Sequence, residues 1–285
     1  MINSQKIDNL QNEDLFLKIQ YASRRYFNAA ENINYLSWTL CIISAMMIFV
    51  PDSASRLISM GIPALLEVLA LITSCTFNHM LKNAAALRNF FDSHVLMIGE
   101  NNYTDIGAQK LKEIALNAYH KHKKEADIII RNTGRDKPPG VGNWYEFKNT
   151  VDGIQAQFEC QKQNVWWNKK MVKNRLIILL LVWFLLISLF IAMFVLFKSD
   201  ILSIVVCAIG IIVKLTERFW EHYHYHEISI KIETIQNYAE RELTIEVIKE
   251  LQELINKRRE IPVLEINIIH KIKAKQYSSS YEKTS

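Results

Sequence analysis

The chain alternates between long uncharged stretches and stretches in which charged residues recur at helical spacing. The clearest uncharged stretch is 176–197, which holds 22 residues without a charged side chain. A bilayer core about 30 Å thick requires about 20 apolar residues in a helix, and a helix in a soluble core is rarely apolar on every face. We therefore predict that 176–197 crosses a membrane.

Three further stretches have the same character. Residues 33–50 form the first, and residues 57–77 form the second, in which Pro63 is expected to introduce a kink. The last, 201–216, has the weakest signal because its uncharged run is shorter and Lys214 must extend its ammonium toward the membrane surface.

The links within each pair are short, namely 51–56 and 198–200, so we predict two antiparallel hairpins, 33–77 and 176–216. All long polar segments then lie on one side of the membrane. That side carries most of the flanking basic residues, and the opposite side carries only Arg56 and Lys198. The positive-inside rule therefore places both termini and the central body in the cytoplasm.

The polar segments predict an all-α membrane protein, with four transmembrane helices in two hairpins and a helical cytoplasmic body. Prolines and glycines predict a loop at 132–145. We also expect an N-terminal helix within 1–32 and a helical cytoplasmic domain over 78–175. Within that domain, one helix continues from the second crossing to about 98, another covers 105–131 after a Thr104 cap, and a third begins at about 146. The chain then continues with one long helix over 217–260 and ends in a short strand or extended segment with a disordered tail over 261–285.

The formal net charge of +5 is modest, and anionic lipid headgroups can accept it, so neither DNA nor RNA is an expected partner. Three of the four cysteines lie inside apolar stretches and none forms a Cys-x-x-Cys pair, which argues against a disulfide or zinc framework. No cofactor is expected. The polar first thirty residues also lack the pattern of a cleavable secretory signal.

Glu67 and Lys214 are the candidate pore or gating residues, because each places an ionisable group within a predicted span. Counted from the outer helix ends at 1.5 Å per residue, the two lie at roughly similar depths, about 15 and 20 Å, so an ion pair between the hairpins is geometrically possible. Two interpretations stay open. Glu67 lines an aqueous path, or it locks two helices together.

The histidines of the HYHYH segment invite a metal interpretation, since His222 and His226 share one face of a helix. A juxtamembrane aromatic belt explains the alternating tyrosines without any metal, and the His-Glu-x-x-His pattern is absent. We therefore expect no metal site and keep these two histidines as weak candidates.

The loop at 132–145 is long for a structureless connection in a compact body, which favours a function. Its turn-rich, charged start could present amides and a guanidinium to a phosphate group. The alternative is a connector packed by its aromatic residues. The ligand-contact candidates are Arg131, Arg135, Lys137, Trp144 and Tyr145.

Catalytic motifs are missing from the sequence: there is no phosphate-binding Gly-x-x-x-x-Gly-Lys-Ser/Thr loop and no Gly-x-Ser-x-Gly elbow. We therefore predict a protein that is not an enzyme. A membrane-anchored sensor or docking module without conduction, and a membrane enzyme that uses the histidines or the loop, remain as competing hypotheses.

Several short motifs, in this order around the two hairpins, resemble the SMODS-associated four-transmembrane effectors, and the resemblance spans roughly residues 10 to 260. These motifs are Gln11-Asn12, Ala22, Arg24-Arg25-Tyr26, Ala29-Ala30, Leu87-Arg88-Asn89-x-Phe91-Asp92, Asn132-Thr133-Gly134, Pro138-Pro139-Gly140-Val141-x-Asn143-Trp144-Tyr145 and Cys160-Gln161-x-x-Asn164-x-Trp166-Trp167-Asn168.

The resemblance implies a pore-forming effector of a bacterial anti-phage system in the inner membrane. A nucleotidyltransferase would sense phage and make a cyclic oligonucleotide, and the effector would respond by assembling or opening in the lipid bilayer and arresting the host. A bundle of four helices is too small to enclose a wide aqueous hole, so we also expect a homo-oligomer.

Overall fold

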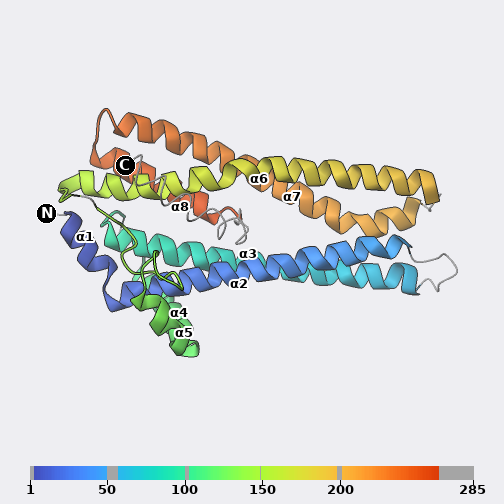
Figure 1. The fold of residues 1–285 in the computed structure, drawn as a ribbon, viewed down its shortest axis with the longest axis horizontal. Helices are drawn as coiled ribbons and strands as arrows, with labels where there is room; N and C mark the ends of the chain where they lie inside the picture. The colour runs from blue at the N-terminus through green and yellow to red at the C-terminus, as the bar shows by residue number, and fades with distance from the viewer. Residues whose placement is uncertain (1–2, 50–56, 100–102, 148, 198–200, 263–285) are drawn as a thin grey trace. The chain divides into compact units, whose positions relative to one another are not determined.

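The computed structural model describes residues 3–49, 57–99, 103–147, 149–197 and 201–262, and every regular element within these ranges is a helix (Figure 1). The all-α class is therefore confirmed for the described part of the chain. The elements are α1 (Ser4–Gln11), α2 (Asp14–Met46), η1 (Met47–Phe49), η2 (Leu57–Gly61), α3 (Ile62–Val95), α4 (Asp105–Lys121), α5 (Lys123–Arg131), α6 (Gly153–Phe197), α7 (Ile201–Ala239) and α8 (Ile245–Glu260).

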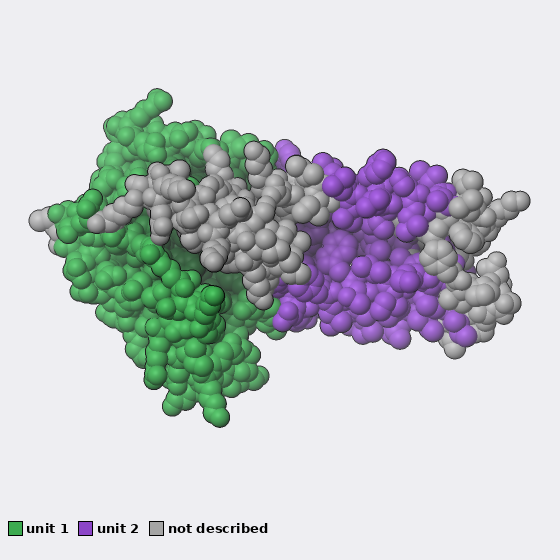
Figure 2. Space-filling model, in the orientation of Figure 1, with its two compact units in different colours: residues 1–30, 78–167, 225–262 green, residues 31–77, 168–224, 263–285 purple. Residues whose placement is uncertain are grey.

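The chain folds into two compact units, which Figure 2 distinguishes by colour. Unit 1 contains the chain up to Ala30 together with Asn78–Trp167 and Tyr225–Pro262, and unit 2 contains Glu31–Phe77 and Asn168–His224. The long helices α2, α3, α6 and α7 each contribute one part to each unit.

Unit 2 contains segments of these four helices around one small apolar cluster. Cys41 of α2, Ala70 of α3 and Ile211 and Leu215 of α7 form its buried centre, and Leu179, Val182, Trp183 and Leu186 of α6 pack against it. Small residues at the centre allow close approach of helix backbones, as in membrane bundles.

One helix of the described part, α3, is long and apolar enough to cross a membrane, and a shorter apolar stretch, Leu179–Leu189, lies in α6. The predicted links 51–56 and 198–200 and the predicted strand and tail within 263–285 lie outside the described residues. Pro63, expected to kink the second stretch, instead occupies the first turn of α3 after a π-helical segment, where a missing N–H costs no helical hydrogen bond.

Unit 1 has a larger core, to which α1, α2, α3, α4, α6, α7 and α8 all contribute. Helix α3 ends three residues earlier than predicted. Met97 adopts a left-handed conformation (φ 53°), and the amide of Ile98 donates to the carbonyl of Ser93 over 3.0 Å, a Schellman ending. Gly99 also has a positive φ but lies beyond this helix end.

At three places, where the sequence predicted one helix, the structure has two. The predicted N-terminal helix divides at Asn12, whose side chain donates to the Asp8 carbonyl over 2.9 Å. The predicted helix 105–131 does begin at a Thr104 cap, but it breaks at His122 (φ −131°, ψ 38°). The break allows Ala126 and Ile129 of α5 to pack with Tyr21 and Val141 in a small apolar cluster separate from the main core.

The third division replaces the predicted helix 217–260. Helix α7 ends at Ala239 and α8 begins after Thr244, whose side chain accepts the amide of Val247 at 3.4 Å. The turn returns the apolar face of α8 to the core of unit 1, where Ile248, Leu251 and Ile255 are fully buried. Burying three such side chains stabilises the fold by about 1.5–3 kcal/mol each, which outweighs the gain from continuing one exposed helix.

Candidate functional site

A polar interior within unit 2 is the first candidate site. Lys214 of α7 is buried, and its ammonium contacts the hydroxyls of Ser37 on α2 and Ser74 on α3, the latter at 3.5 Å. The same ammonium lies 5.3 Å from the ring centroid of Trp38. The two serine oxygens are 3.0 Å apart, and Ser37 also donates to the Ala70 carbonyl over 3.1 Å. The lysine charge is thus held by hydroxyl groups and an aromatic face.

Glu67 of α3 lies beside Ser44 of α2, and its carboxylate is pressed directly against Gly210 of α7. A side chain at position 210 would occupy the space that the carboxylate fills. One carboxylate oxygen, Oε1, is buried and has no hydrogen-bond partner among the described residues. A buried carboxylate oxygen without a hydrogen bond costs free energy.

The possible ion pair between Glu67 and Lys214 does not form: no described carboxylate lies within 4.0 Å of the lysine nitrogen. The ammonium of Lys214 bonds the hydroxyls of Ser37 and Ser74 instead, and the carboxylate of Glu67 packs against Gly210. Because Gly210 and Lys214 are four residues apart on α7, they lie on one face of that helix. The two ionisable groups therefore occupy successive levels of the same interior.

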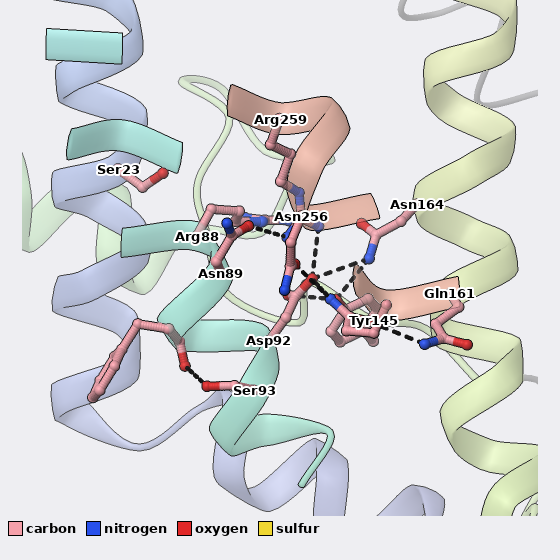
Figure 3. A network of polar contacts seen from close by, with 12 residues as sticks. Ser23, Arg88, Asn89, Asp92, Ser93, Tyr145, Gln161, Asn164, Asn256 and Arg259 are labelled. Atoms are coloured by element: carbon pink, nitrogen blue, oxygen red, sulfur yellow. Dashed lines mark hydrogen bonds and ion pairs between the residues drawn. The ribbon is translucent and has the colours of Figure 1, made fainter. Parts of the chain in front are cut away.

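A buried polar network in unit 1 is the second candidate site, and Figure 3 shows Asp92 of α3 at its centre. Asp92 is fully buried and pairs with Arg259 of α8 at 2.6 Å. The phenol of Tyr145 donates to its other oxygen over 2.7 Å, and the side-chain amides of Asn164 and Gln252 approach at 3.4 Å. One carboxylate therefore connects α3, α6, α8 and the loop.

Burial also sets the protonation states in this network. It raises the pKa of Tyr145 well above its usual value, and the Asp92 charge raises it further, so the phenol stays a hydrogen-bond donor. Desolvation lowers the pKa of Arg88 to about 10, which still leaves the guanidinium charged at neutral pH. Arg88 donates to the Gln20 amide oxygen and lies 3.6 Å from the ring centroid of Trp144.

The loop before α6 is held in place by side-chain amides. Gln11 bonds both backbone groups of Tyr145, accepting its amide at 2.7 Å and donating to its carbonyl over 3.1 Å, and Gln163 does the same for Glu146 at 3.2 and 2.7 Å. Helix α6 begins only at Gly153, which has a φ of 60°, so the helix predicted from about 146 starts later, and the described residues 146–147 and 149–152 are not helical.

The predicted ligand-contact residues lie in different surroundings, one buried and the others on the surface. Tyr145 is 1% exposed and belongs to the buried network, whereas Trp144 is 43% exposed. Arg131 and Lys137 are exposed, and Arg135 pairs with Glu146 at 2.6 Å on the surface.

The amides near the start of the loop are largely used internally, which argues against a phosphate cradle there. Asp136 accepts from both the amide and the hydroxyl of Thr133, at 2.7 and 2.9 Å, and these bonds lower its pKa. The amides of Gly140 and Gly142 donate to the carbonyls of Thr133 and Asn132.

The weak metal candidates show no ligand set. His222 is buried and His226 is exposed, and no group of three or more His, Cys, Asp or Glu side chains suited to a metal occurs among the described residues.

Reasoning from the sequence named Glu67 and Lys214 because a charge within an apolar run is a local signal. It gave no role to Asp92, Arg259 or Gln163. Asp92 and Arg259 are 167 residues apart, and no local pattern joins them. Several network residues, including Arg88, Asp92, Tyr145 and Asn164, nevertheless belong to the motifs that carry the family resemblance.

The fold and these sites define an all-helical protein with an apolar helix of membrane-spanning length and buried polar groups. The chain belongs to the SMODS-associating 4TM effector family, because the model of the SMODS-associating 4TM effector domain matches residues 5–283. It is thus a membrane effector of defence systems associated with nucleotide signalling. Comparisons with curated proteins and with solved structures give no match.

Proposed function

We propose that the chain crosses the bacterial inner membrane four times with both termini in the cytoplasm, oligomerises, and permeabilises that membrane when a nucleotide second messenger signals phage infection. One observation carries the proposal: unit 2 has apolar side chains outside and ionisable groups inside. A water-soluble bundle has the reverse arrangement.

Large apolar side chains are exposed on all four helical segments of unit 2. Phe184 of α6 is 69% exposed and Leu71 of α3 is 64% exposed. Many exposed apolar side chains on one bundle are unfavourable in water and neutral in lipid. Its other members are Leu36, Ile42, Ile43 and Met46 on α2, Ile62, Leu65, Val68, Leu69 and Ile72 on α3, Leu180, Leu181, Leu185, Ile187, Leu189 and Ile191 on α6, and Ile209, Ile212 and Val213 on α7.

The ionisable side chains inside unit 2 favour an ion-conducting role over a role as a membrane anchor alone. Ionisable side chains within a membrane normally mark an ion or proton path, and unit 2 places Lys214 one helical turn from the contact of Glu67 with Gly210. Apolar side chains and the Lys214 contacts occupy the centre of one bundle, so an aqueous path requires several copies or a rearrangement.

The trigger reaches the membrane through continuous helices. Helix α3 carries Glu67 in unit 2 and Asp92 in unit 1 without a break. A change at the Asp92 network can therefore rotate or tilt the helix segment that carries Glu67, as in other switching proteins whose helices shift as rigid bodies.

Liposome leakage tests the proposal. The full chain, reconstituted with an entrapped fluorescent dye, should release the dye only when a cyclic oligonucleotide of the matching class is added. Glu67→Gln should change the rate of release. Binding of the messenger without release would instead support the rival function, a membrane-anchored sensor or docking module.

A further inference from the structure

Three arginines of unit 1 are buried or nearly so, and only one of them has unmatched donors. Arg88 is bonded to Gln20 and stacked on Trp144, and Arg259 is paired with Asp92. Arg258 of α8 is 3% exposed, and both its Nε and its Nη2 are buried without a hydrogen-bond partner among the described residues.

The two unmatched nitrogens form one edge of the guanidinium. On this edge two N–H groups point in parallel, at the spacing of two oxygens of a phosphate or a carboxylate. This edge has the geometry to bind one oxyanion with two hydrogen bonds, whereas scattered unsatisfied atoms would suggest only imperfect packing.

The local charge balance also favours an anion. Asp92 is the only buried carboxylate that the described part of unit 1 contains, and Arg259, Tyr145, Asn164 and Gln252 already occupy it. Among the described residues, the guanidinium of Arg258 lies near the ring of Tyr225, whose centroid is 5.8 Å away, and has no paired carboxylate. Its place in the last turn of α8 is favourable for a cation, but this dipole effect is small beside the cost of burying an unpaired charge.

We propose that the Nε–Nη2 edge of Arg258 binds a phosphate group, and that this phosphate belongs to the nucleotide trigger. The second half of the statement rests on the proposed function. The adjacent Arg259 donates hydrogen bonds to Asp92 and Asn89 of α3. A phosphate bound at Arg258 would therefore lie beside the contact between the end of α8 and α3.

The test uses the full chain in nanodiscs of neutral phosphatidylcholine. The probes are inorganic pyrophosphate and a panel of cyclic di- and trinucleotides, and the readout is the midpoint of thermal unfolding. We expect at least one probe to raise the midpoint of the wild type, because a ligand of the folded state stabilises it by mass action. Arg258→Met should weaken that probe about tenfold to a hundredfold, the loss expected for one charge-assisted contact.

Arg258→Met without ligand should melt at the same temperature as the wild type or higher, because the variant removes an unpaired buried charge. The matched control is Lys257→Met, which removes a neighbouring exposed charge on α8 and should bind like the wild type. Arg258→Lys keeps the charge and loses the fork, so it provides a second variant if Arg258→Met fails to fold; it should also bind more weakly.

A parallel series in nanodiscs containing phosphatidylglycerol identifies the source of the phosphate. A stabilisation that requires this lipid and disappears in Arg258→Met would confirm the phosphate site but assign it to a headgroup, overturning the messenger assignment. Equal probe affinity in Arg258→Met and the wild type would overturn the site. The site would also be overturned if neither the probes nor the lipid raised the unfolding midpoint of the wild type. Dye release that fails while binding persists would refute the proposed pore and leave the site intact.

Discussion

At the scale of single residues, three ionisable groups lie in well-defined surroundings. Asp92 has four donors around it, Lys214 has two hydroxyls, and Glu67 is pressed against a glycine. Burial makes these contacts sensitive to change, because removing one partner leaves the other desolvated and unmatched.

Asp92→Asn should lower the free energy of unfolding by about 3 kcal/mol, because Arg259 loses the one carboxylate that pairs with it among the described residues, in a mostly buried setting. Chemical denaturation in detergent, followed by tryptophan fluorescence, measures this loss. Asp14→Asn is the control. It breaks the pair with Lys18, in which Asp14 is 78% exposed, and should cost no more than about 0.5 kcal/mol. Equal effects of the two substitutions would show that the Asp92 network does not hold unit 1 together.

Gly210→Ala should increase dye release without a messenger, because the new methyl group must displace the Glu67 carboxylate from α7. The same substitution in a Glu67→Ala background should have little effect, since the displaced group is then absent. This double-mutant cycle isolates the contact between the two residues. Additive effects in the cycle would indicate that Gly210 acts through helix packing and not through Glu67.

At the scale of elements, local patterns predict where helices lie better than where they end. The uncharged runs predicted helix at 33–50, 57–77, 176–197 and 201–216, and the described parts of these ranges are largely helical. The turn before α8 was missed because the residues from Glu240 to Val247 have no proline or glycine, and only burial of distant apolar side chains favours the turn. Thr244 was the available local signal, since threonine is a preferred first residue before a helix.

Thr244→Ala should destabilise α8 by about 0.5–1 kcal/mol, because the amide of Val247 loses its side-chain acceptor. Hydrogen exchange at the first turn of α8 measures this directly and should accelerate several-fold. Thr244→Ser retains the hydroxyl and should exchange at the wild-type rate. Unchanged exchange in the alanine variant would mean that apolar burial alone positions the helix.

At the scale of the whole molecule, the sequence predicted the all-α class and drew attention to Glu67 and Lys214, of which Lys214 is buried and Glu67 is half-buried. It did not predict the polar network of unit 1, whose members come from α3, α6, α8 and the loop. Such contacts depend on the tertiary fold, whereas a charge inside an apolar run is visible in one segment. The family places the chain in a membrane, and the proposed killing mechanism requires that both hairpins lie in lipid.

Labelling of single cysteines in intact cells tests this requirement most directly. In a variant without native cysteines, a cysteine at position 53 or 199 should react with a membrane-impermeant maleimide added to bacteria whose outer membrane is permeabilised. A cysteine at exposed Gln109 in unit 1 should react only after the inner membrane is lysed. Protection of 53 and 199 in intact cells, or labelling of 109 there, would contradict the four crossings and the mechanism built on them.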